Sequence, residues 1–475
     1  MSNRRDFLKL AGIAGCGMIG ANVACSNNMS DDEKMKFIRE SAEKGRSQAF
    51  NMSGYAAPKL DTVRIGYVGV GSRGSGAVEL AASIGNVEVV AVCDVVQEKV
   101  DSTIKSVEGK FKPDAYVGKD AWKQVCERDD IDMIYICTPW EMHAPMAIYA
   151  MQQGKHAAVE IPAAITMDEC WELVETSEKT KKHCMMLENT CYDFFEMLTL
   201  NMARHGFFGE VIHVEGAYLH DIFESFFKKE ARWNLWRLRN NLTSGSLYPM
   251  HGLGPICQIL NVNCGDKMDY MVSMSSEDFM MRAKAEEMAK LDPDFEPFVE
   301  AGNFRGNMSS SIIKTANGKT ILVQHDVSSP RPYSRLHTIS GTKASAQKYP
   351  LPRRVAVGHE WLNEEEIKEL EEKYTPELIR KVGKMAKEVG GHGGTDYLLT
   401  WRMIDCLRNG LPLDQDVYDA AAWSSIIPLS KWSVANGSRP INIPDFTNGK
   451  WKTNKAFDLT LNGGGTTTVC GMTIS

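Results

Sequence analysis

The fold is decided by residues 63–74, which have the sequence Val-Arg-Ile-Gly-Tyr-Val-Gly-Val-Gly-Ser-Arg-Gly. The apolar first half predicts a β-strand. The Gly-x-Gly-x-x-Gly pattern of Gly69, Gly71 and Gly74 follows at once, before a helix that we expect to start at Gly76. The first glycine allows a tight turn, the second lets the backbone approach a pyrophosphate, and the third lets helix and strand pack closely. This order predicts a dinucleotide-binding βαβ unit.

A second strand, expected over 87–93, ends at Asp94. A carboxylate in this place can accept hydrogen bonds from a ribose diol and repels a 2′-phosphate, which favours NAD over NADP. Further short strands, expected over 133–137, 156–159 and 184–187, alternate with helices such as 144–153. This alternation predicts a doubly wound parallel sheet of the α/β class, a Rossmann domain.

The second half of the chain has a different pattern. Alternating strands are expected over 211–218, 309–315, 320–327 and 337–341, with a hairpin turn at 316–319. They predict an α+β domain with an open, mainly antiparallel sheet that carries helices on one face. Residues 360–388 are charged and predict a solvated, mostly helical insertion that Pro376 interrupts. Residues 397–408 predict an amphipathic helix that Gly410 closes.

Composition sets the outer limits. A chain of 475 residues with 43% hydrophobic residues is long enough for two large cores. The net charge of −7, without a basic block beyond the N-terminus, argues against a nucleic-acid partner. The 12 cysteines form no ligand-spaced pairs, so we expect free thiols and no metal site. We divide the chain into an export signal (1–25), a polar tether (26–60), the NAD-binding domain (61–187) and a substrate and oligomerisation domain (188–475).

The N-terminus carries two arginines, Arg4 and Arg5, followed by a small, apolar run over residues 10–24. This resembles a twin-arginine export signal, and a short amphipathic helix is the alternative. Cys16 and Cys25 each end a run that is similar to a lipoprotein cleavage box, so lipid attachment at either residue and simple cleavage both stay open. We expect an exported protein of the periplasm or cell envelope that uses the twin-arginine machinery and has no transmembrane span.

A family resemblance rests on a series of runs in a fixed order. They include Thr-Pro-Trp-Glu-Met-His at 138–143, Glu-Ile-Pro at 160–162, Glu-Asn-Thr-Cys-Tyr at 188–192, Tyr-Pro-Met-His at 248–251 and Gly-Gly-His-Gly-Gly at 390–394. With the Rossmann unit, they resemble the Gfo/Idh/MocA oxidoreductase superfamily. More closely, the chain resembles glycoside hydrolase family 109, the NAD-dependent α-N-acetylgalactosaminidases. The resemblance covers nearly the whole chain after the tether.

The resemblance implies an exported glycosidase that cleaves terminal α-linked N-acetylgalactosamine by oxidation at C3, elimination, addition of water and reduction. Tyr248 and His251 are the candidates for catalytic proton transfer. Besides the three fingerprint glycines, the residues implied to hold NAD are Ser72, Arg73, Asp94, Trp140, His143, Glu160, Ile161, Asn189, Tyr248 and His251. The residues implied to line the sugar pocket are Tyr218, Arg237, Tyr248 and Tyr333.

Two departures from the wider pattern bear on function. Dehydrogenases of the superfamily usually have Glu-Lys-Pro, whereas the lysine position here is Ile161, which cannot titrate. This favours the hydrolase over the main alternative, an exported NAD(P)-dependent sugar oxidoreductase; a sugar-binding protein with structural NAD is a further alternative. The segment after Arg237 lacks the acidic residue and histidine that we expect there, which leaves the exact sugar open.

Several residues have two interpretations at this stage. His143 could contact the cofactor or cap a helix, His392 could belong to the site or to a glycine-rich loop, and Trp236 could be core or sugar platform. Asp193 and Asp221 are the nearby acids, and we expect both to bond backbone rather than act as a glycosidase pair. By analogy with the superfamily, the exposed face of the second sheet predicts a homodimer.

Overall fold

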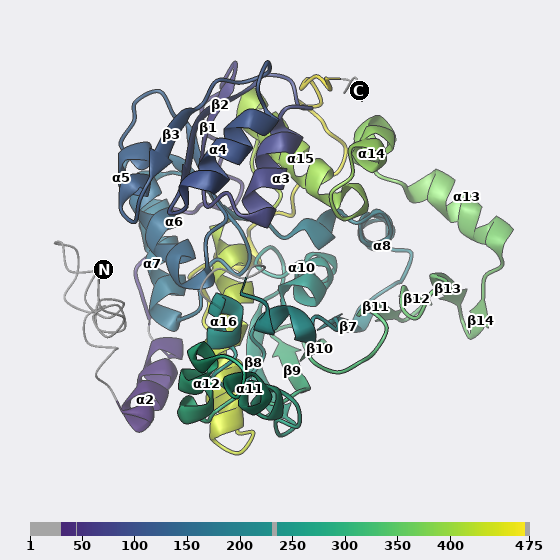
Figure 1. Cartoon of the computed structure of the whole chain (residues 1–475). Coiled ribbons are helices and arrows are strands. Elements are labelled where there is room, and N and C mark those ends of the chain that lie inside the picture. Colours follow the sequence, from purple (N-terminus) through teal and green to yellow (C-terminus); the bar gives the residue numbers. More distant parts are fainter. Residues whose placement is uncertain (1–29, 44, 230–234, 471–475) are drawn as a thin grey trace.

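The computed structural model describes residues 30–43, 45–229 and 235–470. The predicted export signal, with Cys16 and Cys25, lies outside the described residues. Two sheets organise the described part of the chain. The Rossmann strands lie at the top of Figure 1 and the second sheet lies below them. Among the described residues, no helix combines the length and the apolar composition that crossing a membrane requires.

The first sheet is parallel throughout and has the strand order β3-β2-β1-β4-β5-β6. Its strands are β1 (Val63–Val68), β2 (Val87–Asp94), β3 (Asp114–Val117), β4 (Met133–Ile136), β5 (His156–Val159) and β6 (Cys184–Met186). Its helices are α3 (Ser72–Ala81), α4 (Gln97–Ser106), α5 (Ala121–Cys126), α6 (His143–Gln152) and α7 (Met167–Thr180). β4, β5 and β6 are buried along their full length, as strands covered on both faces are. The predicted α/β class is confirmed.

The start of the first helix was predicted too late. α3 begins at Ser72, directly after Gly71, and not at Gly76. Two glycines among the first five residues of α3, Gly74 and Gly76, lower the helix propensity that a sequence pattern can detect. The first turn of α3 is therefore formed by residues of the glycine fingerprint and not by the apolar run that follows it.

The second sheet has nine strands in the order β14-β13-β12-β11-β7-β10-β9-β8-β15. Only β7 (Val211–Leu219) and β10 (Thr320–Asp326) pair in parallel, so the sheet is mainly antiparallel as predicted. The hairpin of β9 (Ser309–Thr315) and β10 is also confirmed. The strands that were not predicted are β8 (Met268–Ser275), β12 (Ala344–Gln347), β13 (Arg354–Val357), β14 (Glu360–Trp361) and β15 (Ile441–Asn442), and β11 (Ser334–Gly341) starts earlier than expected. One face packs against α10 (Met250–Ile259) and α16 (Val417–Ala435).

Two helical predictions need correction. The charged segment 360–388 begins with strand β14 and then forms α13 (Glu364–Tyr374) and α14 (Glu377–Val389), with Pro376 between them as predicted. Only α13 and its neighbouring strands project from the body (Figure 1), because α14 buries Leu378, Val382 and Ala386. The helix α15 (Thr395–Asn409) is not amphipathic, since residues 395–407 are all buried. Its end at Gly410 is confirmed.

The two halves of the chain are interleaved. α15 contacts α3 and β1, and α16 contacts α7 and β6, so the C-terminal helices return to the Rossmann domain. The segment predicted as a tether also packs on the body, since α2 (Asp31–Ala42) contacts α7 and α16. Arg46 then forms a buried ion pair with Glu178 of α7 at 2.5 Å. The remaining helices are α8 (Phe194–Arg204), α9 (Trp236–Asn240), α11 (Met281–Ala289) and α12 (Glu296–Ala301).

Candidate active site

The fingerprint loop has the shape that a pyrophosphate requires. Gly69 has a φ of +85°, and a Cβ on Gly74 would lie 1.9 Å from the Gly69 carbonyl oxygen, so neither position accepts a side chain. A Cβ on Gly71 would meet nothing within 4 Å, which leaves open space above the loop. No side chain caps the N-terminus of α3 at Ser72, so its backbone N–H groups are available for an anion. The loop therefore fits a dinucleotide.

Asp94 lies at the end of β2, beside this loop. Its carboxylate accepts hydrogen bonds from the backbone N–H of Val70 at 2.8 Å and from that of Val96 at 3.0 Å. These bonds hold the carboxylate at the carboxyl edge of the sheet, where the ribose of a bound dinucleotide lies. The negative charge at this point fits NAD and disfavours the 2′-phosphate of NADP.

Arg73 is tied to residues from distant parts of the chain. Its guanidinium pairs with Glu160, which follows β5, and with Asp396 in the first turn of α15, each at 2.6 Å. Asp396 also accepts hydrogen bonds from the side chains of Asn189 at 2.6 Å and His392 at 2.7 Å. Although burial opposes it, the charges of Glu160 and Asp396 raise the pKa of Arg73. The structure thus brings three predicted NAD contacts, Arg73, Glu160 and Asn189, and the candidate His392 together around the Arg73–Asp396 pair, in which Asp396 was not predicted.

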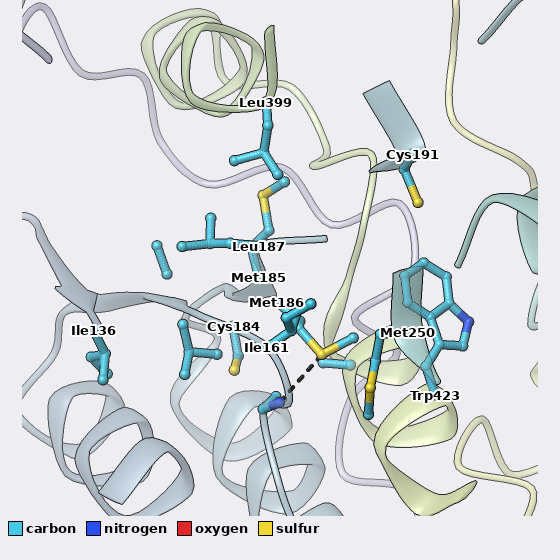
Figure 2. Close-up of a cluster of buried hydrophobic side chains, with 14 of the residues drawn as sticks. Ile136, Ile161, Cys184, Met185, Met186, Leu187, Cys191, Met250, Leu399 and Trp423 are labelled. Carbon is cyan, nitrogen blue, oxygen red and sulfur yellow. Dashed lines mark hydrogen bonds between the residues drawn. The ribbon is translucent and has the colours of Figure 1, made fainter. Parts of the chain in front are cut away.

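Two other predicted NAD contacts lie deeper. His143 is buried, and its ring nitrogens lie 2.7 Å from the carbonyl oxygens of Pro162 and Thr138, so it joins the loops that follow β4 and β5. Ile161 is 3% exposed and belongs to the apolar cluster of Figure 2, with Met186 and Met250. Because this position is apolar and buried, proton transfer at the site depends on other side chains.

Those side chains form a cluster of aromatic rings at the predicted sugar pocket. Trp140, on the short helix after β4, stacks on Tyr248 with 5.4 Å between ring centroids and 18° between planes. Tyr218, on β7, lies 5.3 Å from Tyr248 and 4.9 Å from His251 between ring centroids. Burial raises the pKa of Tyr248, so its phenol stays protonated at neutral pH. The four rings bring together loops of the Rossmann domain and the second sheet.

The ends of this ring cluster are polar. At one end the Arg237 guanidinium lies over Trp236, Trp140 and Tyr248, at 4.8, 5.5 and 5.5 Å from the ring centroids, and its buried Nε has no hydrogen-bond partner. Trp236 thus packs with the cluster, 5.4 Å from Trp140 between ring centroids. At the other end the Tyr218 hydroxyl is 2.8 Å from Nδ1 of His220. The predicted sugar residue Tyr333 packs against the His220 ring at 4.9 Å.

His251 has a carboxylate partner that sequence reasoning missed. His251 lies in the first turn of α10, and its Nδ1 is 2.8 Å from Oε1 of Glu188, which follows β6. The Glu188 side chain is fully buried. Burial alone would raise its pKa, but the charge of His251 and hydrogen bonds from His251 and Thr190 outweigh burial and lower it. Glu188 is therefore ionised, and a carboxylate only accepts hydrogen bonds, so Nδ1 carries a proton.

The remaining acids do not form a glycosidase pair. Asp193 caps α8 through the N–H of Phe195 and pairs with Arg335 and Lys348 at 2.7 and 2.6 Å. Asp221 accepts a hydrogen bond from the backbone of Phe223, as expected. The ten cysteines in the described ranges are free thiols, and no cluster within those ranges is suited to a metal ion. Two cavities of about 280 and 440 Å³ contain none of the predicted site residues.

The fold and this site define a class of protein. Residues 63–188 match the family model for the oxidoreductase family with an NAD-binding Rossmann fold. Solved structures with the same architecture include levoglucosan dehydrogenase in complex with NADH, at 16% identity and a TM-score of 0.59, covering 81% of this chain and all of that one. Apo scyllo-inositol dehydrogenase from Lactobacillus casei has a TM-score of 0.57 at 13% identity, covering 81% of this chain and 99% of its own. The chain is an NAD-binding protein with the Gfo/Idh/MocA fold.

The family is set by the second domain. Residues 192–453 match the model for the glycosyl hydrolase 109 C-terminal domain. An α-N-acetylgalactosaminidase of Bacteroides fragilis is 46% identical over 408 residues, 84% of this chain and 95% of its own length. A glycosyl hydrolase family 109 protein of Bacteroides thetaiotaomicron is 43% identical over 458 residues, 91% and 95% of the two chains. The chain belongs to glycosyl hydrolase family 109 and is a glycoside hydrolase that uses NAD.

Proposed function

We propose that the protein cleaves terminal α-linked N-acetylgalactosamine by a redox-neutral route in which its bound NAD is restored in every turnover. One observation carries the proposal. His251 and the protonated Tyr248 lie in one cluster of aromatic rings with Tyr218, while the usual lysine position of the superfamily is the buried Ile161. The sugar itself is inferred from the related B. fragilis enzyme.

Bound NAD supplies an acceptor for the hydride at C3 of the sugar and returns that hydride at the end of the cycle. The protein supplies the proton transfers. A ketone at C3 makes the C2 proton acidic, because the resulting carbanion is delocalised as an enolate. His251, with its proton on Nδ1, presents Nε2 as the base that removes this proton and later returns it. The C1 substituent leaves and takes up a proton, and water adds at C1 and gives up a proton. The C3 hydroxyl proton that is lost with the hydride is taken back on reduction, so the whole cycle balances as hydrolysis.

Tyr248 and Arg237 have supporting roles in this scheme. The protonated phenol of Tyr248 donates a hydrogen bond to the substrate oxygen at which charge develops. The guanidinium of Arg237 is held among three rings, and we place it beside the sugar, where it can donate to a hydroxyl or acetamido oxygen. The aromatic rings present flat apolar surfaces to the sugar.

The test is release of p-nitrophenol from p-nitrophenyl α-N-acetylgalactosaminide in deuterated water, by purified protein without added NAD. We expect release, with deuterium at C2 of the sugar product. The His251→Ala variant is expected to keep its NAD and its fold and to lose cleavage by more than about 10³-fold. Absence of release across α- and β-glycosides, with and without added NAD, would instead favour the sugar oxidoreductase.

We also propose that the chain is exported through the twin-arginine route and attached to lipid at Cys16 or Cys25. The paired arginines and the apolar run after them support this proposal. A redox-neutral enzyme suits a compartment where NAD is not replenished. Replacing Arg4 and Arg5 by lysine is expected to retain the protein in the cytoplasm, as cell fractionation would report. Labelling with a palmitate analogue, compared between Cys16→Ala and Cys25→Ala, distinguishes the two cysteines from simple cleavage.

A homodimer through the outer face of the second sheet is the third part of the proposal. The side chains of Ile212, Tyr270, Met274 and Ile312 are exposed, on β7, β8 and β9. In the sheet register Ile312 pairs with Val272 and with Leu322, which makes the apolar surface continuous. Light scattering after size exclusion is expected to report a dimer, and Met274→Lys with Ile312→Lys a monomer.

A further inference from the structure

Glu188 is a buried carboxylate that forms its ion pair with His251. Its Oε1 lies within hydrogen-bond distance of three donors: Nδ1 of His251 at 2.8 Å, and the backbone N–H and hydroxyl of Thr190 at 3.0 and 2.7 Å. His251 is the only one of these donors that can carry a charge. The other carboxylate oxygen, Oε2, is buried without a hydrogen-bond partner. Most buried carboxylate oxygens have a partner, so this one calls for an explanation.

The neighbouring backbone makes room for this carboxylate. A Cβ on Gly254, one turn along α10 from His251, would lie 2.9 Å from Cγ of Glu188. The Glu188 carbonyl oxygen is held by the Gln415 side chain at 3.0 Å. The Thr190 hydroxyl also lies 2.8 Å from the His251 carbonyl oxygen, so the same residue contacts both members of the pair. Contacts from α10 and from the segment after β6 thus fix the position of Glu188 relative to His251.

We infer that Glu188 is a positioning residue for His251: it keeps the proton on Nδ1, aims Nε2 into the pocket and stabilises the imidazolium that forms during proton transfer. The inference rests on the proposed function for the identity of the reaction. Because the Glu188 side chain is fully buried, the carboxylate acts through His251 and not on the substrate. A carboxylate–histidine pair in acyl-transfer enzymes has the same roles: the carboxylate orients the histidine base and stays ionised.

The charges around His251 are few. The titratable groups that face it are Glu188 from the end of β6, Tyr218 from β7 and Tyr248 from the segment before α10. His220, which bonds the Tyr218 hydroxyl, also interacts with His251: besides burial, the charge of His251 lowers the pKa of His220. Glu188 is therefore the one carboxylate in contact with His251 among the residues described, and its removal should change how His251 titrates.

The test variant is Glu188→Gln. The backbone N–H of Thr190 cannot reverse its polarity, so the amide oxygen takes the place of Oε1 and the hydrogen bond to Nδ1 survives without the charge. We expect the acid limb of the kcat/KM profile to move down by about one pH unit, and kcat to fall about 10- to 100-fold at neutral pH. The control is Glu178→Gln, which removes a carboxylate that is equally buried but pairs with Arg46 and bonds Tyr418 instead of a residue of the candidate site. It should leave the profile unchanged.

A second readout does not need glycosidase activity. The titration midpoint of the His251 ring signal is followed by NMR in the NAD-bound protein without substrate, and the signal is identified by its absence from His251→Ala. We expect the midpoint of Glu188→Gln to lie about one pH unit below that of the wild type. If the wild type cleaves no glycoside, the proposed function fails, whereas this midpoint still decides the role of Glu188.

Two outcomes would overturn the inference. One is a His251 midpoint that is the same in Glu188→Gln and the wild type; the other is an equal shift in Glu178→Gln, which would show that loss of any buried carboxylate has this effect. If Glu188→Gln does not fold, Glu188→Asp takes its place. This variant keeps the negative charge, but its side chain is one methylene group shorter, so the carboxylate lies farther from His251. Its midpoint is expected to shift in the same direction by a smaller amount, and an unchanged midpoint would again overturn the inference.

Discussion

Arg73 and Asp396 are 323 positions apart in the chain and form an ion pair, with 2.6 Å between Nη1 and Oδ2. The pair joins the fingerprint loop to the start of α15, so the C-terminal part of the chain contributes directly to the NAD site. Asn189 and His392 complete the cluster through Asp396. Retention of NAD should therefore depend on a residue that lies far outside the Rossmann motif.

We expect Asp396→Asn to release NAD more readily, because Arg73 loses a charged partner beside the pyrophosphate loop. The dissociation constant for NAD should rise about tenfold, which is about 1.4 kcal/mol. The measurement is the NAD content of the protein after exhaustive dialysis. Asp405→Asn is the matched control, since Asp405 is a buried acid of the same helix that instead binds the backbone of Gly465 and Thr467. Equal NAD loss in both variants would contradict the role of the Arg73 pair.

Alanine variants of two fingerprint glycines should distinguish an effect on NAD binding from an effect on folding. A Cβ on Gly71 meets no protein atom, so Gly71→Ala is expected to fold normally and to lose NAD affinity by tenfold or more, since it occupies the space of the pyrophosphate. Gly74→Ala would place its Cβ against the Gly69 carbonyl and should cost about 3 kcal/mol or prevent folding.

Gly76→Ala is the control for these two variants. Its Cβ also meets nothing within 4 Å, but it lies on the helix and away from the loop. We expect it to keep NAD and to stabilise the protein by up to about 1 kcal/mol, from the better helix propensity of alanine. Thermal unfolding and NAD titration measure both effects, and a Gly71→Ala variant that binds NAD like Gly76→Ala would contradict the assignment of the loop.

Tyr248→Phe tests the phenol without disturbing the pocket. Phenylalanine keeps the stack on Trp140, so NAD binding and stability should change little. We expect kcat to fall by about 10²-fold or more, because the donor to the substrate oxygen is lost. Steady-state kinetics on the p-nitrophenyl substrate provide the measurement. A kcat within twofold of the wild-type value would contradict the proposed role of the Tyr248 phenol as a donor to the substrate.

Glu196 makes the protein sensitive to acid. Its side chain is 1% exposed and pairs with Arg335 at 2.6 Å and Lys348 at 2.7 Å. Burial alone would raise its pKa, but the charges of Lys348 and Arg335 lower it to about 2. Because the folded pKa lies below the unfolded value of about 4.3, this stabilisation is complete above about pH 4.3. It is lost as the pH falls towards 2, and its full size is about 3 kcal/mol.

Urea unfolding at several pH values tests this prediction. Glu196→Gln is expected to be less stable than the wild type at pH 7, since among the described residues Arg335 and Lys348 then keep only Asp193 as a carboxylate partner. Its free energy of unfolding should then depend less on pH over the acid range. Parallel pH dependences in the two proteins would show that Glu196 is not the source of the acid sensitivity.

Much of the fold was predictable because its signals are local. The glycines at 69, 71 and 74 act on the backbone of their own turn, and Asp94 ends its own strand. The alternating pattern of β7, β9 and β10 reflects the two faces of each strand. Errors arose where tertiary packing changed the environment of an element. α15 was predicted to be amphipathic, but it is buried on all sides because the Rossmann domain and α14 both cover it.

The sequence by itself determined the NAD-binding loop, the preference for NAD, the absence of a titratable residue at position 161 and the membership of a family. Each of these depends on residues that are close together in the chain or on the order of short motifs. Only the tertiary structure decided that Glu188 supports His251 and that Asp396 holds Arg73. A buried charge needs a partner within hydrogen-bond distance, and that partner is chosen by how distant segments pack, which no local pattern encodes.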